Sequence, residues 1–325
     1  MVAQEHAFCG KRFGRVDEGL PVGRLHGAGN GLADAAQGGV RLGQRPRPRR
    51  VVGVDHGERA YGTAAVAHDG PVPRADAFAF LDWPGPIPFA HRGGASEVPE
   101  NTMPAFAHAV ALGYRYVETD VHVTADGALL AFHDDILDRV TDRAGVIADL
   151  PWATVRDAKV DGLEPIPLFE DLLGAWPELR VNVDPKHDAA VEPLAAAIQR
   201  CGAVDRVCVG AFSDERLERM RALVPGICTS LGPMATIHLG LAANGEDIAE
   251  LPAPCAQVPT HVGETAVVTE AVLAEAHRRG LQVHVWTIDD EPEMRRLLDL
   301  GVDGIMTDRP AVLRSVLEGR GQWYG

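Results

Sequence analysis

The chain has 325 residues, 46% of them hydrophobic, which is enough for a sizeable core in one large domain or two small ones. Its formal net charge of −15 argues against nucleic acid or an anionic membrane as the main partner. No stretch approaches the ~18 uncharged apolar residues of a membrane-spanning helix, and residues 1–10 lack the layout of a signal peptide. We therefore expect a cytoplasmic protein without stable membrane insertion, and the composition leaves its oligomeric state open.

Cysteine usage agrees with a reducing compartment. The five cysteines are odd in number and show no short spacing of the kind that ligates metals. They are Cys9, Cys201, Cys208, Cys228 and Cys255. We expect buried or incidental thiols rather than a disulfide framework or a zinc site.

Residues 1–75 differ in composition from the rest of the chain. They hold 11 basic and 7 acidic residues, whereas the remainder holds 20 basic and 39 acidic residues. Their apolar residues show no sustained period of 2 or 3.6, which predicts a disordered extension or a stretch upstream of the true start. A functional basic tail is the alternative, because Arg45–Arg50 could touch anionic surfaces. Residues 76–325 are expected to form the folded domain.

From Ile87 onward, short apolar segments alternate with helical patterns. The predicted strands are Ile87–Ala90, Tyr116–Val121, Leu179–Asp184, Arg206–Ala211, Ile227–Ser230, Ala256–Val258, Gln282–Trp286 and Gly304–Met306. The predicted helices are Thr102–Leu112, Leu168–Ala175, Ala190–Cys201, Asp214–Val224, Thr269–Arg279, Pro292–Leu300 and Pro310–Leu317. Eight strands with intervening helices indicate an α/β protein with a (β/α)₈ TIM-type barrel, with a doubly wound open sheet as the alternative. For residues 233–252 the sequence predicts only a loop or a partial helix.

Ionisable and aromatic side chains gather at or just after the predicted strands, where barrel enzymes place their reacting groups. In chain order they are His91, Arg92, Glu118, Asp120, His133, Asp184, Lys186, Phe212 and Trp286. These positions are far apart in the sequence but would meet at one mouth of a barrel. This convergence is the main reason to expect an enzyme.

The carboxylates in this set suggest a metal site. Glu118 and Asp120 are two apart on a strand and therefore point the same way. Two like charges on one face inside a barrel are costly unless a cation lies between them. Asp184 could supply a third carboxylate, and oxygen ligands of this kind suit Mg²⁺ or Ca²⁺. The alternative is that Glu118 and Asp120 form salt bridges with nearby arginines.

The remaining positions suit acid–base chemistry on an anionic substrate. His91 follows a predicted strand and His133 follows the apolar run Leu129–Phe132. Two imidazoles can act as base and acid at neutral pH, although either could be a structural histidine. Arg92 and Lys186 supply positive charge that could hold a phosphate oxygen. Phe212 and Trp286 could pack on the carbon skeleton of a substrate, although large aromatic side chains more often belong to a core.

Several motifs now occur in a recognisable order. They are His91-Arg92-Gly93-Gly94, Pro99-Glu100-Asn101-Thr102, Glu118-Thr119-Asp120-Val121, Asp126-Gly127, His133-Asp134, Asn182-Val183-Asp184-Pro185-Lys186, Trp286-Thr287, Gly301-Val302-Asp303-Gly304-Ile305 and Thr307-Asp308-Arg309-Pro310. Together they resemble the bacterial, cytoplasmic type of the glycerophosphodiester phosphodiesterase family. The resemblance spans about Phe89 to Leu317.

The resemblance implies a barrel that hydrolyses a small glycerophosphodiester to sn-glycerol 3-phosphate and an alcohol with a divalent metal. By position, Glu118, Asp120 and Asp184 look like metal ligands. His91 and His133 look like the acid–base pair.

Arg92 and Lys186 occupy the positions of phosphate contacts in the same resemblance. One departure concerns Asp184, because the family usually has the longer glutamate there. Two alternatives remain: a lysophospholipase D-like hydrolase that uses the same site, and a non-catalytic phosphate-binding relative. No apolar interfacial helix is evident in the sequence, which disfavours the lipid substrate.

Overall fold

The computed structural model describes residues 74–325. The predicted extension, residues 1–75, lies outside this part except for its last two residues, and so do Cys9 and Arg45–Arg50. Within the described part, no helix is long and apolar enough to cross a membrane.

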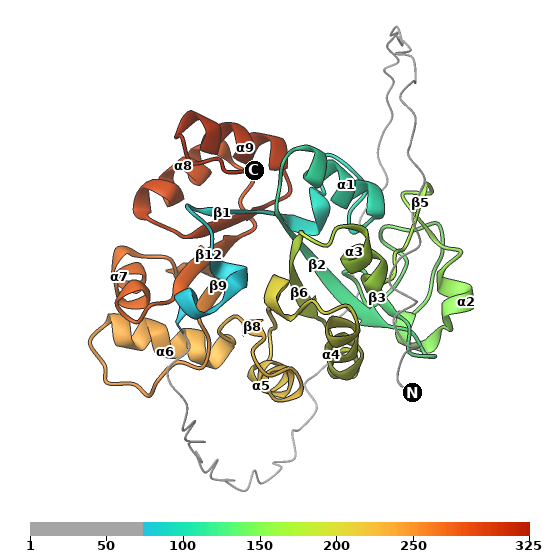
Figure 1. The fold of residues 1–325 in the computed structure, drawn as a ribbon, viewed down its shortest axis with the longest axis horizontal. Helices are drawn as coiled ribbons and strands as arrows, with labels where there is room; N and C mark the ends of the chain where they lie inside the picture. Colours follow the sequence, from blue (N-terminus) through green and yellow to red (C-terminus); the bar gives the residue numbers. More distant parts are fainter. Residues whose placement is uncertain (1–73) are drawn as a thin grey trace, which may run out of the picture. The chain divides into compact units, whose positions relative to one another are not determined.

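Eight parallel strands form a barrel with helices around it (Figure 1). The strands are β1 Ile87–Ala90, β2 Tyr116–Val123, β6 Arg180–Pro185, β7 Val207–Val209, β8 Cys228–Thr229, β9 Cys255–Pro259, β12 Gln282–Trp286 and β13 Gly304–Thr307. The main helices are α1 Met103–Ala111, α3 Phe169–Ala175, α4 Val191–Arg200, α5 Asp214–Leu223, α6 Pro233–Ala243, α7 Glu270–Arg278, α8 Glu291–Leu300 and α9 Pro310–Gly319. All predicted strands and helices are present, with ends within two residues of those expected.

The strand order identifies the fold as a barrel and excludes the open sheet. β1 pairs with β2 on one side and with the last strand, β13, on the other. The ring then runs through β12 and β9 in one direction and through β6, β7 and β8 in the other. β8 and β9 meet only at a bridge between Ser230 and Cys255, where the Leu231 N–H donates to the Cys255 carbonyl at 2.8 Å. The predicted (β/α)₈ architecture is therefore confirmed, with one short seam.

An insertion between β2 and β6 departs from the regular alternation. β3 (Leu129–Ala131) runs antiparallel to β2, and α2 (Trp152–Val155) and the small ladder of β4 (Lys159–Val160) and β5 (Glu164–Pro165) follow it. The insertion has its own apolar cluster, and the pairing of β3 with β2 joins it to the barrel. The insertion carries residue 133 back toward the strand ends.

The stretch from residue 233 to residue 252 begins with the helix α6 and continues without helix, so the predicted partial helix is confirmed. The sequence pattern could not delimit the helix because apolar residues occur on all of its sides, so no polar face marks its period. A two-stranded hairpin, β10 (His261–Val262) with β11 (Thr265–Ala266), follows β9. α6 packs beside α7, as Figure 1 shows.

A buried tyrosine joins distant parts of the barrel, and its loss should measurably lower stability. The Tyr114 hydroxyl, between α1 and β2, donates to the Pro310 carbonyl at the start of α9 at 2.7 Å. We expect Tyr114→Phe to lower the free energy of unfolding by about 0.5–1.5 kcal/mol, because the buried Pro310 carbonyl loses one hydrogen bond. Urea unfolding measures the change.

Tyr324→Phe is the matched control, because Tyr324 is 44% exposed. This variant should change the free energy of unfolding by less than about 0.5 kcal/mol. Equal stability of both variants and the wild type would show that the buried hydroxyl contributes nothing.

Candidate active site

One cavity of about 950 Å³ lies at the carboxyl ends of the strands and is lined by all nine ionisable and aromatic residues that the sequence placed at one mouth. It is lined by His91, Arg92, Glu118, Asp120, His133, Asp184, Lys186, Phe212 and Trp286, among others. The side chains that were predicted to meet because they follow strands do lie together, although they are up to 195 positions apart in the sequence.

The first histidine is held by a carboxylate from the other end of the chain. The pairing of Ala90 with Thr307 places His91 beside Asp308, and the imidazole Nδ1 lies 2.6 Å from Asp308 Oδ1. Its Nε2 lies 3.7 Å from Glu118 Oε2 and so faces the cavity. Burial lowers the pKa of His91, but Glu118 and Asp308 more than offset this effect and hold it above its usual value.

The second histidine is held in the same way by a chain of charged groups. His133 Nδ1 lies 2.6 Å from Asp134 Oδ1, and Arg139 donates to both Asp134 oxygens. Arg139 also donates to both oxygens of Glu100. The hydrogen bonds from Arg139 hold the pKa of Asp134 well below its usual range. The His133 carbonyl is itself fixed by His122 Nε2 at 2.9 Å.

Three carboxylates face the cavity from two adjacent strands. The β2–β6 register places Asp120 directly beside Asp184, with Glu118 one layer deeper. Lys186 Nζ bridges the pair, at 2.6 Å from Asp120 Oδ1 and 2.8 Å from Asp184 Oδ2. Burial and, to a smaller extent, the carboxylate of Asp120 raise the pKa of Glu118 to about 7. The mouth therefore contains a buried carboxyl group, Glu118, whose ionised form is disfavoured by its surroundings.

The pKa values of the other two carboxylates are shifted in opposite directions. Although burial opposes it, Lys186 and Arg92 lower the pKa of Asp120 below its usual value. Burial raises the pKa of Asp184, despite the neighbouring ammonium. The Asp184 Oδ1 atom is buried and has no hydrogen-bond partner. An unpaired buried carboxylate oxygen is costly, and it is the kind of donor that a bound cation satisfies.

Arg92 is fixed in an unusual backbone conformation at the end of β1. Its φ is 51°, in the left-handed region, and it is followed by Gly93 and Gly94, both with positive φ. The turn directs the Arg92 N–H toward Glu118 Oε2 at 3.3 Å and its Nη1 toward Glu100 Oε1 at 3.1 Å. Arg92 Nε lies 3.5 Å from Asp120 Oδ2. The predicted alternative, carboxylates paired with arginine, thus holds in part for Asp120.

The cavity continues away from the charged groups into an apolar half. Phe212, 67% exposed, packs edge-on against Trp286 with ring centroids 5.7 Å apart, so these two aromatics line the mouth rather than the core. Beyond them the walls come from α6, the β10–β11 hairpin and α7. Their apolar lining includes Leu231, Ile237, Leu239, Leu241, Val258, Val262, Val267 and Val272.

Sequence reasoning gave no role to Asp308 and Arg139, the groups that orient the two histidines. Arg139 lies in the insertion and not at the end of a barrel strand, so the strand-end pattern could not select it. Asp308 directly follows β13, but its role depends on the contact with His91 across the closing strand pair. The available signal was the motif context: Asp308 belongs to the closing Thr307–Pro310 run, and Glu100 to the Pro99–Thr102 run.

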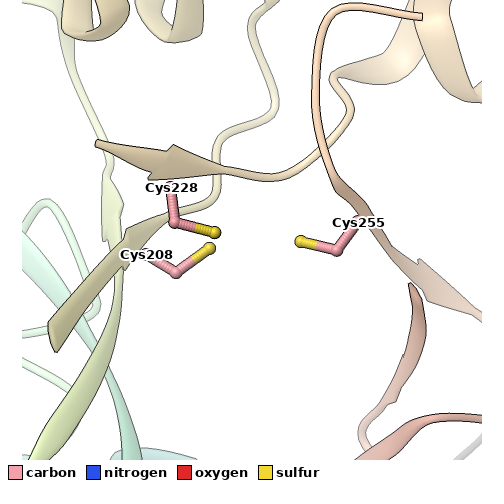
Figure 2. A group of neighbouring side chains, drawn as sticks. All are labelled: Cys208, Cys228 and Cys255. Carbon is pink, nitrogen blue, oxygen red and sulfur yellow. The ribbon is translucent and has the colours of Figure 1, made fainter. Parts of the chain in front are cut away.

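The described cysteines include three that converge inside the barrel. Cys208, Cys228 and Cys255 are buried, and their sulfur atoms lie within 4.8 Å of one another (Figure 2). They belong to the apolar cluster of Phe89 and Tyr116, near the amino ends of the strands and away from the ionisable mouth. Buried thiols pack there as small apolar side chains, in line with the sequence prediction.

A second group of possible ligands lies beside His133. His187 Nε2 is 2.9 Å from Asp135 Oδ1, and His122 Nε2 is 3.9 Å from the same oxygen. His122 is buried, but Asp135 and His187 are largely exposed. Because His122 Nε2 donates to the His133 carbonyl, we interpret His122 as a structural support.

The comparisons with known proteins agree with this geometry. Residues 91–312 match the model of the Glycerophosphoryl diester phosphodiesterase family. The chain is 40% identical to a probable glycerophosphodiester phosphodiesterase 2 of Mycobacterium tuberculosis over 79% of this chain and 99% of that protein. It is 29% identical to the lysophospholipase D GDPD1 of Rattus norvegicus over 70% of this chain and 85% of that protein.

A solved structure shares the fold. An Oleispira antarctica phosphodiesterase in complex with the product sn-glycerol 3-phosphate superposes with a TM-score of 0.59 and 23% identity, over 72% of this chain and 97% of that one. The family match covers more than half of the chain and includes both histidines and all three carboxylates. The chain therefore belongs to the glycerophosphoryl diester phosphodiesterase family and is an enzyme of that class, a phosphoric diester hydrolase.

Proposed function

We propose that this enzyme hydrolyses glycerophosphodiesters to sn-glycerol 3-phosphate and an alcohol by a metal-dependent mechanism with two histidines as acid and base. The observation that carries the proposal is the pair of histidine–carboxylate contacts on one cavity, each made through Nδ1. Each contact leaves Nε2 available for the substrate. The product bound in the Oleispira antarctica structure supports the same product class.

Charge at the mouth supports the requirement for a divalent cation. When all are ionised, Glu118, Asp120 and Asp184 carry three negative charges against the two positive charges of Arg92 and Lys186. A phosphodiester is itself an anion and would be repelled by this surplus. Glu118, Asp120 and the unpartnered oxygen of Asp184 are the oxygen donors that would hold Mg²⁺ or Ca²⁺. When bound, such an ion supplies positive charge that stabilises the charge developing on phosphate.

The chain's own groups would perform the proton transfers. Arg92 and Lys186 hold the non-bridging phosphate oxygens near the two imidazoles. One histidine takes the proton of the nucleophile, which is water or the neighbouring glycerol hydroxyl. The other donates a proton to the leaving alkoxide. Asp308 and Asp134 orient the rings and stabilise the imidazolium forms.

Removal of either imidazole should cost a large part of the rate. We expect His91→Ala and His133→Ala each to lower kcat about 10²–10⁴-fold, because each removes an acid or base from the reaction. Release of glycerol 3-phosphate from glycerophosphocholine measures the rate. His277→Ala is the control, since His277 lies on α7 and pairs with Asp303. Near-normal turnover in either active-site variant would refute the role of that histidine.

Metal removal should abolish activity reversibly. We expect a chelator to stop release of glycerol 3-phosphate and Mg²⁺ or Ca²⁺ to restore it, because only a cation reverses the negative surplus at the mouth. The same ions should raise the Tm of the metal-free wild type, but much less that of Glu118→Gln, which lacks one ligand charge. Full activity after exhaustive chelation contradicts the metal requirement.

A second candidate substrate is a lysophospholipid. The observation that favours it is the apolar half of the cavity, which is much larger than a glycerol phosphodiester headgroup needs. At about 950 Å³ the cavity is as large as sites for drug-sized ligands. The lysophospholipase D relative supports this candidate, and α6 supplies the apolar helix that the sequence had not revealed.

Filling the apolar half should separate the two substrate classes. Gly240 lines the cavity, and a Cβ added there meets no atom within 4 Å. We expect Gly240→Phe to lower kcat/KM for lysophosphatidylcholine at least about tenfold, because each excluded methylene loses ~0.8 kcal/mol of burial, and to spare glycerophosphocholine.

Gly319→Phe is the control, because Gly319 also has open space around it but lies on α9, away from the cavity. If the wild type hydrolyses glycerophosphocholine but not lysophosphatidylcholine, the lysophospholipid is rejected as a substrate.

A further inference from the structure

α6 carries apolar residues on the side that faces solvent as well as on the side that faces the core. Ala235 and Leu239 are buried, whereas Met234 and Ile237, one turn apart, are 55% and 53% exposed. No residue of this helix carries a formal charge at neutral pH. A surface helix of a soluble domain ordinarily has a polar outer face, so the exposed side of α6 is suited to contact something other than water.

Two further exposed apolar side chains lie at the same mouth. Phe212 follows β7, and Val262, 65% exposed, lies on the β10–β11 hairpin. Phe212, Ile237 and Val262 all line the catalytic cavity, and Met234 shares the exposed face of α6 with Ile237. We call these four side chains the apolar rim. Their gathering at one opening distinguishes them from single apolar side chains scattered over a surface.

The charge around the apolar rim selects the kind of partner. Residues 232–244 and 259–269, which contribute three of the four rim side chains, contain no lysine or arginine and a single acidic residue, Glu264. Anionic lipid headgroups attract clusters of basic residues, which this region lacks. A zwitterionic lipid surface imposes no such requirement.

We propose that the apolar rim docks onto the surface of a zwitterionic lipid aggregate, such as a micelle or bilayer rich in phosphatidylcholine. Side chains at the rim would enter the boundary between headgroups and acyl chains, where apolar side chains are stabilised. The rim is continuous with the apolar wall of the cavity, so a single-chain phospholipid leaving the aggregate meets apolar surface throughout its path to the phosphodiester site. The passage of a phospholipid from the aggregate to the active site rests on the proposed function, whereas the docking of the apolar rim onto lipid does not.

Sedimentation of the full chain with phosphatidylcholine vesicles tests the docking. Neutral vesicles are used because residues 1–75 are net basic and could bind anionic lipid independently of the rim. We expect the wild type to bind and Met234→Glu to bind at least about tenfold more weakly, since a charge at an interfacial position must be dehydrated. Met234 does not line the cavity, so hydrolysis of micelle-free glycerophosphocholine should be unchanged.

Leu163→Glu is the matched control. Leu163 is 70% exposed, lies between β4 and β5, and undergoes the same change of side-chain type outside the rim. This variant should bind vesicles like the wild type. Light scattering of each protein without lipid completes the test, because a second copy of the chain could cover the same surface.

Two results overturn the proposal: absence of wild-type binding to the vesicles, or equal binding by wild type and Met234→Glu. A dimer that dissociates on Met234→Glu, with no vesicle binding, also overturns it and assigns the rim to self-association. If the wild type binds the vesicles but does not hydrolyse glycerophosphocholine, the result counts against the proposed function alone.

Discussion

The pairing of β2 with β6 is the constraint on which the site depends. It forces Asp120 and Asp184 side by side inside a barrel, with Glu118 on the same face of β2. Such an arrangement is tolerable only with positive charge beside it, and Lys186 meets part of that need by bridging the pair. The compensation is incomplete, as the high pKa of Glu118 and the unpaired oxygen of Asp184 indicate. This incomplete compensation of negative charge is the basis for the proposed binding of a divalent cation and then of phosphate.

The two histidines are oriented by carboxylates of different origin. The carboxylate that holds His91 comes from the turn after β13, which becomes a neighbour of β1 only when the first and last strands pair. The carboxylate that holds His133 lies in the next position along the chain, and Arg139 and Glu100 fix it from outside the barrel. One histidine contact therefore requires the complete fold, whereas the other is largely local. Damage to the closing strands should disturb His91 before His133.

Sequence reasoning predicted the strands and the nine cavity residues well because both follow from local rules. Buried parallel strands are apolar runs, and their carboxyl ends share one mouth. Sequence reasoning failed where the role of a residue depends on its contact with a segment far away in the sequence. Asp308 is one acidic side chain among 46 acidic residues until β13 is placed beside β1. α6 was predicted only as a loop or a partial helix, because apolar residues lie on its exposed side as well as on its buried side and no polar face marks its period.

The cavity divides into two halves that different parts of the chain build. The ionisable half comes from β1, β2, β6 and the insertion, and its charges bear on the chemistry. The apolar half comes from α6, the hairpin and α7, and it bears on the group attached to the phosphate. Because the two halves share few elements, substitutions in α6 or the hairpin can alter the preferred leaving group without moving the carboxylates. The relatives include proteins named for glycerophosphodiesters and for lysophospholipids. Under the proposed function, one set of reacting groups would serve both substrate classes and the neighbouring wall would distinguish them.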